Sequence, residues 1–246
     1  MIYIANWKMN MGFKEAQNFL MEFKNKIPNQ NSFVFLPPAL LSGLFQKENL
    51  HWGAQNVFLK SKGAFTGENS ASVLKEMGAQ FCLVGHSERR YSFGETDTEI
   101  QRKFDLIHQH QLIPILCIGE LTPKKTERDS TLKKQLSWLK TYEKYQNLSS
   151  DSGRPEAFKK IPFIVAYEPV WAIGTGETPD PFEVNETHHK IKEYLQIQNV
   201  PVFYGGSVNS ENAQAFSQQK HVDGFLLGGA SLKLEELNKV YERSSS

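Results

Sequence analysis

The sequence has little of several features that mark particular classes of protein. Its 246 residues carry 28 Lys and Arg against 27 Asp and Glu, which leaves a formal net charge of +1. This balance gives no electrostatic basis for nucleic acid or an anionic membrane as the main partner. No apolar run approaches the length of a membrane span, and the first residues lack the basic region of a signal peptide. We therefore expect no membrane segment and no secretion signal.

Cysteine is scarce, and no metal-binding pattern is evident. Cys82 and Cys117 both lie in apolar runs, which favours reduced core thiols in a cytoplasmic protein over a disulfide framework. The cysteines have no CxxC spacing. His188 and His189 are adjacent in a helical pattern, so they point to different sides of the helix. The sequence predicts no metal site.

A dinucleotide-binding fingerprint is also missing. Open doubly wound sheets carry a glycine-rich turn after their first strand, whereas residues 6–10 read Asn-Trp-Lys-Met-Asn. Strand-like apolar runs instead alternate with helical patterns along the chain. The predicted strands cover residues 2–7, 32–36, 50–55, 81–84, 112–118, 161–167, 200–204 and 224–227. Eight strand–helix units predict an α/β fold, a single-domain (β/α)8 barrel over residues 1–246.

A carboxylate stands where the predicted strand 161–167 stops. Pro169 follows Glu168 at once and restricts its backbone to extended conformations. The next residues include Val170 and Trp171 and end in two glycines. A charged group at a strand end, beside an apolar segment that can fold over it, indicates a catalytic base with a lid. The alternative is a buried loop with an ion-paired glutamate.

Other polar residues follow other predicted strands. Because all strands of a parallel barrel end at one rim, residues far apart in sequence meet there. The rim is predicted to hold Asn6, Lys8, residues 85–88 with His86, Glu168, residues 205–207 and residues 228–231. The two glycine-rich turns follow the last two strands, where backbone amides can bind a phosphate. Tight turns explain each Gly-Gly pair about as well.

Each rim residue also has a structural interpretation. Lys8 could be a surface charge, and His86 could be a hydrogen-bonded core histidine. If residues 87–90 open a short helix, however, a backbone amide there could donate to one ring nitrogen of His86. The imidazole would then stay neutral, and its other N–H could polarise a carbonyl. For Glu88 we favour a structural ion pair with Lys8 or Arg89.

Several stretches together resemble one known family. They are residues 6–10, 53–56, 63–68, 85–90, 166–176, 204–208 and 228–232, in the same order over almost the whole chain. On these residues the chain resembles the triosephosphate isomerase family. The resemblance implies a (β/α)8 barrel that interconverts dihydroxyacetone phosphate and D-glyceraldehyde 3-phosphate through an enediolate, in glycolysis and gluconeogenesis, with no cofactor or metal.

The resemblance also implies a role for each rim residue. Glu168 would move a proton between two substrate carbons, and a neutral His86 would act on the substrate oxygens. Lys8 would stabilise the developing enediolate, positioned by Asn6. The substrate phosphate would be held by the amides of Gly174, Ser207, Gly228 and Gly229, under a lid formed by residues 169–176.

A cytoplasmic homodimer is implied as well. The loop Gly63–Glu68 resembles the family's dimer loop, with Thr66 reaching the partner subunit's Asn6 region. Asn69 stands where the family commonly has a branched apolar residue, which bears on dimer strength. The segment 147–160 is longer than usual and should lie at the rim away from the chemistry. Two alternatives stay open: another sugar-phosphate enzyme, which the complete set of Lys8, His86 and Glu168 disfavours, and a barrel whose main role is partner binding.

Overall fold

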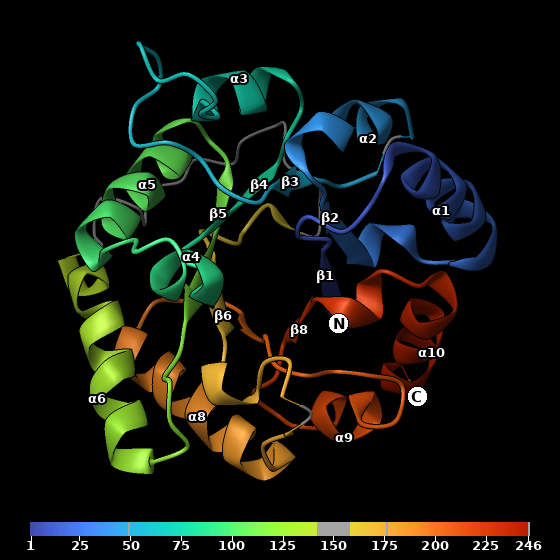
Figure 1. Ribbon diagram of the computed structural model, residues 1–246. Helices are drawn as coiled ribbons and strands as arrows, with labels where there is room; N and C mark the ends of the chain where they lie inside the picture. Colours follow the sequence, from blue (N-terminus) through green and yellow to red (C-terminus); the bar gives the residue numbers. More distant parts are fainter. Residues whose placement is uncertain (49, 142–157, 176, 246) are drawn as a thin grey trace.

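Parallel strands form a ring at the centre of the molecule, and helices surround the ring (Figure 1). The computed structural model describes residues 1–48, 50–141, 158–175 and 177–245. The strands are β1 (Ile2–Asn6), β2 (Phe33–Leu36), β3 (Gly53–Ala54), β4 (Phe81–Val84), β5 (Ile113–Ile118), β6 (Ile164–Tyr167), β7 (Val202–Tyr204) and β8 (Gly224–Leu227). The predicted (β/α)8 barrel is confirmed.

Helices follow the strands on the outside of the ring. They are α1 (Phe13–Lys26), α2 (Ser42–Glu48), α3 (Ala71–Glu76), α4 (Ser87–Tyr91), α5 (Asp97–Gln109), α6 (Lys125–Leu136), α8 (Pro181–Leu195), α9 (Ala213–Ser217) and α10 (Leu234–Ser244). Short 3-10 helices are η1 (Gln30–Ser32), η2 (Ala39–Leu41), η3 (Ser137–Thr141), η5 (Val170–Ala172) and η6 (Gly229–Ser231). In the part of the chain that the structure describes, no helix has the length and apolar character to cross a membrane.

The ring closes between β2 and β3, its least regular point. The strands pair in the order β2-β1-β8-β7-β6-β5-β4-β3, and a single parallel bridge between Phe35 and Trp52 joins the two ends. The strand predicted over residues 50–55 is shorter than expected. Beyond β3 the side chain of Gln55 replaces backbone pairing, since its Nε2 donates to the carbonyls of Lys8 (2.7 Å) and Leu36 (2.8 Å).

Other boundaries differ from prediction for local reasons. β6 begins at Ile164 instead of residue 161, because Pro162 has no N–H to donate to a neighbouring strand. The helical pattern of residues 126–145 in the sequence predicts one long helix. α6 instead ends at Leu136 and continues as η3, and residues 142–145 lie outside the described residues. Most of the segment 147–160 lies outside them as well. α8 begins at Pro181 because Asp180 accepts the Phe182 amide at 2.7 Å as N-cap.

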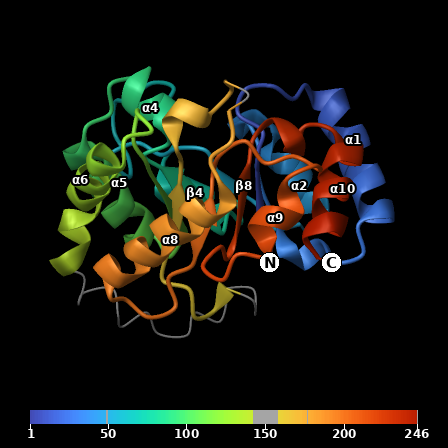
Figure 2. The same cartoon turned by 90° about the horizontal axis from the view of Figure 1, so that it is seen from below.

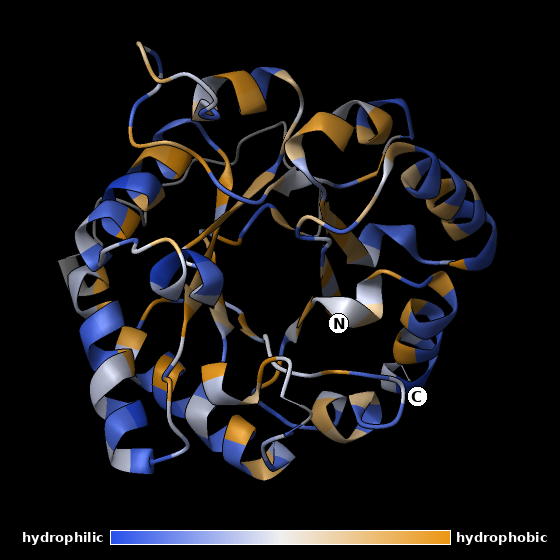
Figure 3. Cartoon of the chain, in the orientation of Figure 1, coloured by the Kyte–Doolittle hydropathy of each residue, from blue (hydrophilic) through white to orange (hydrophobic). Residues whose placement is uncertain are grey.

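The core has two layers, because successive residues of a strand face opposite sides. Ile4, Leu36 and Ile115 fill the inside of the ring, whereas Tyr3 and Phe33 stack at 4.8 Å between the ring and the helices. Figure 3 shows hydrophobic residues concentrated on the strands and hydrophilic ones over the outer helix surfaces. Cys82 and Cys117 are buried and free, as predicted.

The ends of β5 and β6 approach each other very closely. The amide of Glu168 donates to the Ile118 carbonyl at 2.7 Å. A Cβ at Gly119 would overlap the backbone carbonyl of Glu168. Only glycine therefore permits this approach, which fixes the backbone that carries Glu168.

We predict that Gly119→Ala lowers the free energy of unfolding by about 3 kcal/mol, because the added methyl forces β5 and β6 apart. Gly12→Ala is the matched control, since a Cβ at Gly12 meets no atom within 4 Å and its φ of −83° suits alanine. Urea unfolding of both variants measures the difference. Equal stability of the two would contradict the close approach.

Candidate active site

All of the predicted site residues line one cavity of about 300 Å³ at the carboxyl ends of the strands. The structure brings together Asn6, Lys8, His86, Glu168, Gly174, Ser207, Gly228 and Gly229. In Figure 2, α4 and the short gold helix η5 lie at this same end of the ring. Parallel strands thus deliver residues from β1, β4, β6, β7 and β8 to one place.

Glu168 and His86 form a buried pair at the bottom of this cavity. The exposed fraction is 2% for Glu168 and 5% for His86. Oε2 of Glu168 accepts the Ser87 amide at 2.9 Å, and Oε1 lies 3.0 Å from Nε2 of His86. Nδ1 of His86 accepts the Glu88 amide at 3.3 Å, so Nε2 carries the proton that faces Glu168. His86 caps α4, the short helix predicted after it.

Each member of the pair shifts the pKa of the other. Burial alone would raise the pKa of Glu168, but the charge and hydrogen bond of His86 and the Ser87 amide outweigh burial and lower it. Burial alone would lower the pKa of His86, yet the charge and hydrogen bond of Glu168 raise it above its ordinary value. The ionised carboxylate is therefore stable here, and the expected neutrality of His86 is opposed by this carboxylate.

Lys8 holds its ammonium group at the cavity through a strained backbone. Its φ is +50°, which is unusual for any residue other than glycine. The amide of Lys8 donates to Oδ1 of Asn6 at 3.1 Å, and its carbonyl accepts from Gln55. Nζ of Lys8 lies 2.6 Å from Oε1 of Glu88, so the predicted structural ion pair is present. Asn6 and Gln55 together fix the direction of the lysine side chain.

Three glycines of the same cavity leave open space. A Cβ at Gly174 or Gly229 would meet no atom within 4 Å, and one at Gly228 would approach only Cε of Lys8, at 3.7 Å. Packing of the protein does not explain glycine at Gly228 and Gly229, whereas approach of a ligand to the backbone does. Gly174 has φ +71°, which favours glycine.

The predicted lid is held by a residue that the sequence analysis did not single out. Oε1 of Glu120 accepts the indole N–H of Trp171 at 3.0 Å and the hydroxyl of Tyr167 at 2.9 Å. Oγ of Ser207 donates to the Ala172 carbonyl at 2.9 Å. Burial raises the pKa of Glu120 despite these bonds. Gly176, the last lid residue, lies outside the described residues.

Two of the missed residues, Glu120 and Gln55, share one sequence signal. Gln55 directly follows β3 and Glu120 lies two residues after the end of β5, so both are polar residues at the same rim as the predicted site. Ser87 acts through its backbone amide, for which its side chain gave no indication. Position after a strand could therefore have identified Glu120 and Gln55 as rim residues, but not their partners.

The histidines of α8 serve packing. Nδ1 of His188 lies 3.1 Å from the His221 carbonyl, and burial lowers the pKa of His188 to about 3. The exposed His189 instead stacks on the His221 ring. Among the described residues, no group of three or more His, Cys, Asp and Glu could hold a metal ion.

Comparison with known proteins identifies the family. The model of the family described as triosephosphate isomerase matches residues 1–244. The triosephosphate isomerase of Bdellovibrio bacteriovorus is 40% identical, over 97% of this chain and 98% of its own. That of Buchnera aphidicola subsp. Schizaphis graminum is 38% identical over 100% and 98%, and that of Mycoplasma capricolum is 37% identical over 94% and 93%. The chain belongs to the triosephosphate isomerase family.

Proposed function

We infer that this chain is an isomerase that interconverts dihydroxyacetone phosphate and D-glyceraldehyde 3-phosphate in glycolysis. The observation that carries the inference is one cavity that holds a buried carboxylate, an imidazole, an ammonium group and two glycine-rich turns. This combination suits proton transfer next to a carbonyl in a substrate bound by its phosphate. We also propose that residues 1–246 act as one catalytic domain.

Glu168 is the base of the proposed reaction. Its lowered pKa keeps the carboxylate ionised at neutral pH. The carboxylate takes a proton from the carbon beside the substrate carbonyl, which leaves an enediolate, and then returns the proton to the neighbouring carbon. Both oxygens are engaged by Ser87 and His86, so Glu168 exchanges these contacts for the substrate. The reaction is redox-neutral and needs no cofactor or metal.

His86 donates to the substrate oxygens as a neutral imidazole. Glu168 is the main source of its raised pKa, whereas burial and Lys8 lower that pKa. When the carboxylate turns to the substrate, the lowering contributions dominate and favour the neutral form. Because Nδ1 accepts the Glu88 amide, the proton stays on Nε2 and points into the cavity.

The remaining cavity groups bind the charges of the substrate. The Lys8 ammonium stabilises the enediolate oxygen, and Asn6 positions Lys8 through its amide. The amides of Gly174, Ser207, Gly228 and Gly229 bind the phosphate. Closure of residues 169–176 excludes water and protects the enediolate from losing phosphate.

We further propose a cytoplasmic homodimer. The loop Gly63–Glu68, cyan beside α3 in Figure 1, projects beyond the ring of helices. Phe65 packs on Phe58, with ring centroids 4.5 Å apart, which stiffens the loop. A depression of about 630 Å³ beside Lys8 is lined by Met9 and Phe93, whose exposed fractions are 94% and 68%. Exposed apolar side chains of this kind suit burial by a second copy of the loop.

We predict that Glu168→Gln reduces kcat by about a thousandfold with little change in KM, because the amide cannot accept the carbon-bound proton. The measurement is interconversion of the two triose phosphates, coupled to a dehydrogenase. The variant also reveals contaminating host enzyme. Near-native turnover in the variant would refute the role of Glu168, and a folded wild type without turnover would refute the reaction itself.

We predict that Glu168→Gln also lowers the pKa of His86, because the largest contribution that raises it is lost. Ring NMR signals of His86 followed against pH give this pKa. Glu88→Gln is the control, since the exposed Glu88 contributes least, and its shift should be smaller. An unchanged His86 pKa in Glu168→Gln would contradict the coupling.

The same coupling determines the direction in which the stability of the fold changes with pH. The pKa of His86 is higher in the folded chain than its ordinary value, so protonated His86 stabilises the fold fully below the ordinary pKa of 6.5, as long as Glu168 stays ionised. This contribution is lost as the pH rises through the folded pKa. Glu168→Gln should therefore reduce the change in the free energy of unfolding between pH 6.5 and the pKa of His86 in the folded chain.

We predict that the native chain sediments at twice the 28.1 kDa of one chain and that Thr66→Arg produces monomers with reduced turnover. The reason is that a bulky charge at the loop tip cannot enter the depression beside Lys8. Thr126→Arg, on the exposed surface of α6, is the control and should remain dimeric. A wild type that is monomeric at micromolar concentration would rule out the proposed dimer.

A further inference from the structure

Two hydrogen bonds close the base of the loop Gly63–Glu68. The amide of Phe58 donates to the Asn69 carbonyl at 2.9 Å. The Ser70 hydroxyl donates to the Ser61 carbonyl at 2.5 Å. We call these two bonded pairs the neck of the loop, because they hold the segment that enters the loop against the segment that leaves it.

Ser70 closes the neck instead of capping the helix that follows it. It is the N-cap residue of α3, where a serine side chain usually accepts a backbone amide of the first turn. Within α3, which is described in full, no amide donates to the Ser70 side chain. The Ser72 hydroxyl lies 2.8 Å from Oγ of Ser70 and donates to it, since the Ser70 proton is used at Ser61. The local geometry therefore favours a closed neck over a capped helix.

His110 connects this neck to a part of the chain that is distant in sequence. Its Nε2 lies 2.9 Å from Oγ of Ser61, and it is the C-cap residue of α5. The carbonyl of the next residue, Gln111, accepts the ammonium group of Lys75 in α3 at 3.2 Å. A neutral imidazole can accept from the Ser61 hydroxyl and a protonated one can donate to it, so the contact survives protonation. The neck and α3 are thus both attached to the end of α5.

The aromatic contacts of the loop tip are made within the same segment. Phe65 packs on Phe58, and the Lys60 ammonium group lies 5.2 Å from the centre of the Phe65 ring. These contacts stiffen the tip relative to its own neck. The bond between Ser61 and His110 instead fixes the neck relative to the barrel.

We propose that Ser61 and His110 are positioning residues, which hold the loop Gly63–Glu68 in the orientation that enters the partner subunit. This role rests on the proposed homodimer. A loop that is already held in its bound conformation loses less conformational entropy on association. Without the bond each loop would sample more orientations, and a symmetric dimer contains two such loops. Turnover would change only through the fraction of chains that are dimeric.

The first test measures the dimer dissociation constant by sedimentation and by turnover at decreasing protein concentration. Ser61→Ala and His110→Leu should each raise this constant about tenfold, or roughly threefold for each of the two loops, as expected for one lost hydrogen bond. The double variant should show the effect of one single variant, because both substitutions remove the same bond. His110→Gln places an amide nitrogen near the position of Nε2 and should restore most of the native affinity. At concentrations where every variant is dimeric, kcat and KM should equal the native values.

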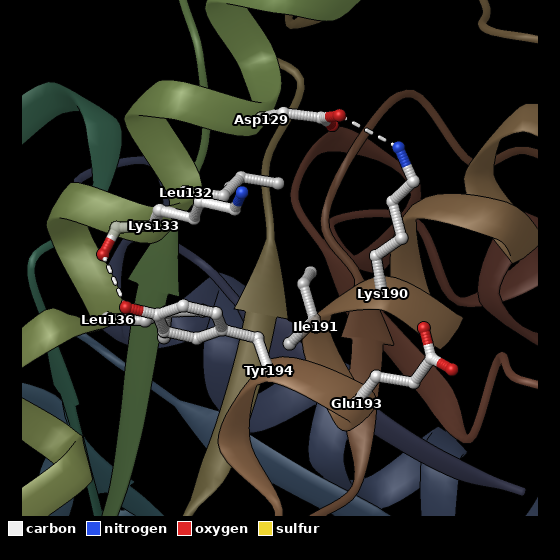
Figure 4. A pocket seen from close by; sticks show the side chains of 8 residues that line it. All are labelled: Asp129, Leu132, Lys133, Leu136, Lys190, Ile191, Glu193 and Tyr194. Carbon is white, nitrogen blue, oxygen red and sulfur yellow. Dashed lines mark hydrogen bonds and ion pairs between the residues drawn. The ribbon is translucent and has the colours of Figure 1, made fainter.

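Two control variants separate positioning from general stability. Tyr194→Phe removes a hydroxyl hydrogen bond between α8 and α6, since the Tyr194 hydroxyl donates to the Lys133 carbonyl at 3.2 Å (Figure 4). Gln109→Leu changes the exposed neighbour of His110. Both controls should leave the dimer dissociation constant unchanged, even where Tyr194→Phe lowers the free energy of unfolding.

The outcomes that overturn the role of Ser61 and His110 are distinct from those that overturn the dimer. An unchanged dissociation constant in the two single variants, an equal increase in Tyr194→Phe, or additive effects in the double variant contradicts this role alone, provided that the native chain is an active dimer. A monomeric native chain would refute the proposed homodimer and this role together.

Discussion

The buried contact of Glu168 with His86 and the Ser87 amide is the interaction on which the rest of the site depends. An unpaired buried carboxylate would cost several kcal/mol, and these two partners offset that cost. Both come from the end of β4 and the start of α4, and Glu168 comes from β6. The close approach at Gly119 fixes the backbone of Glu168. A charged carboxylate is thus held in the core by the packing of three neighbouring strands.

Two adjacent strands end in carboxylates with opposite environments. Glu168 follows β6, and its pKa is lowered by a charged partner. Glu120 follows β5, and burial raises its pKa while it accepts from Tyr167 and Trp171. The environment of Glu168 suits a group that exchanges partners during a reaction. The environment of Glu120 suits a group that connects the predicted lid to the barrel through fixed hydrogen bonds. Environment, and not residue type, separates their roles.

The sequence was sufficient for the barrel and for placing the predicted site residues around one cavity, since both follow from the alternation of strands and helices. Strand ends were less predictable. The side chain of Gln55 replaces backbone pairing beyond β3 through tertiary contacts, and β6 begins only after Pro162. The roles of Glu120, Gln55 and the Ser87 amide also depend on partners far away in sequence. The balance of charges that raises the pKa of His86 required the actual distance to Glu168.

The most direct test of the central claim, proton transfer by Glu168, is isomerisation in D2O followed by proton NMR. A carboxylate that carries the proton can exchange it with solvent before returning it. The account predicts that the product of D-glyceraldehyde 3-phosphate carries one deuterium at the carbon that receives the proton, and that Glu168→Gln forms almost no product. Rapid turnover without any deuterium in the product would mean that hydrogen moves directly between the carbons, and it would contradict the account.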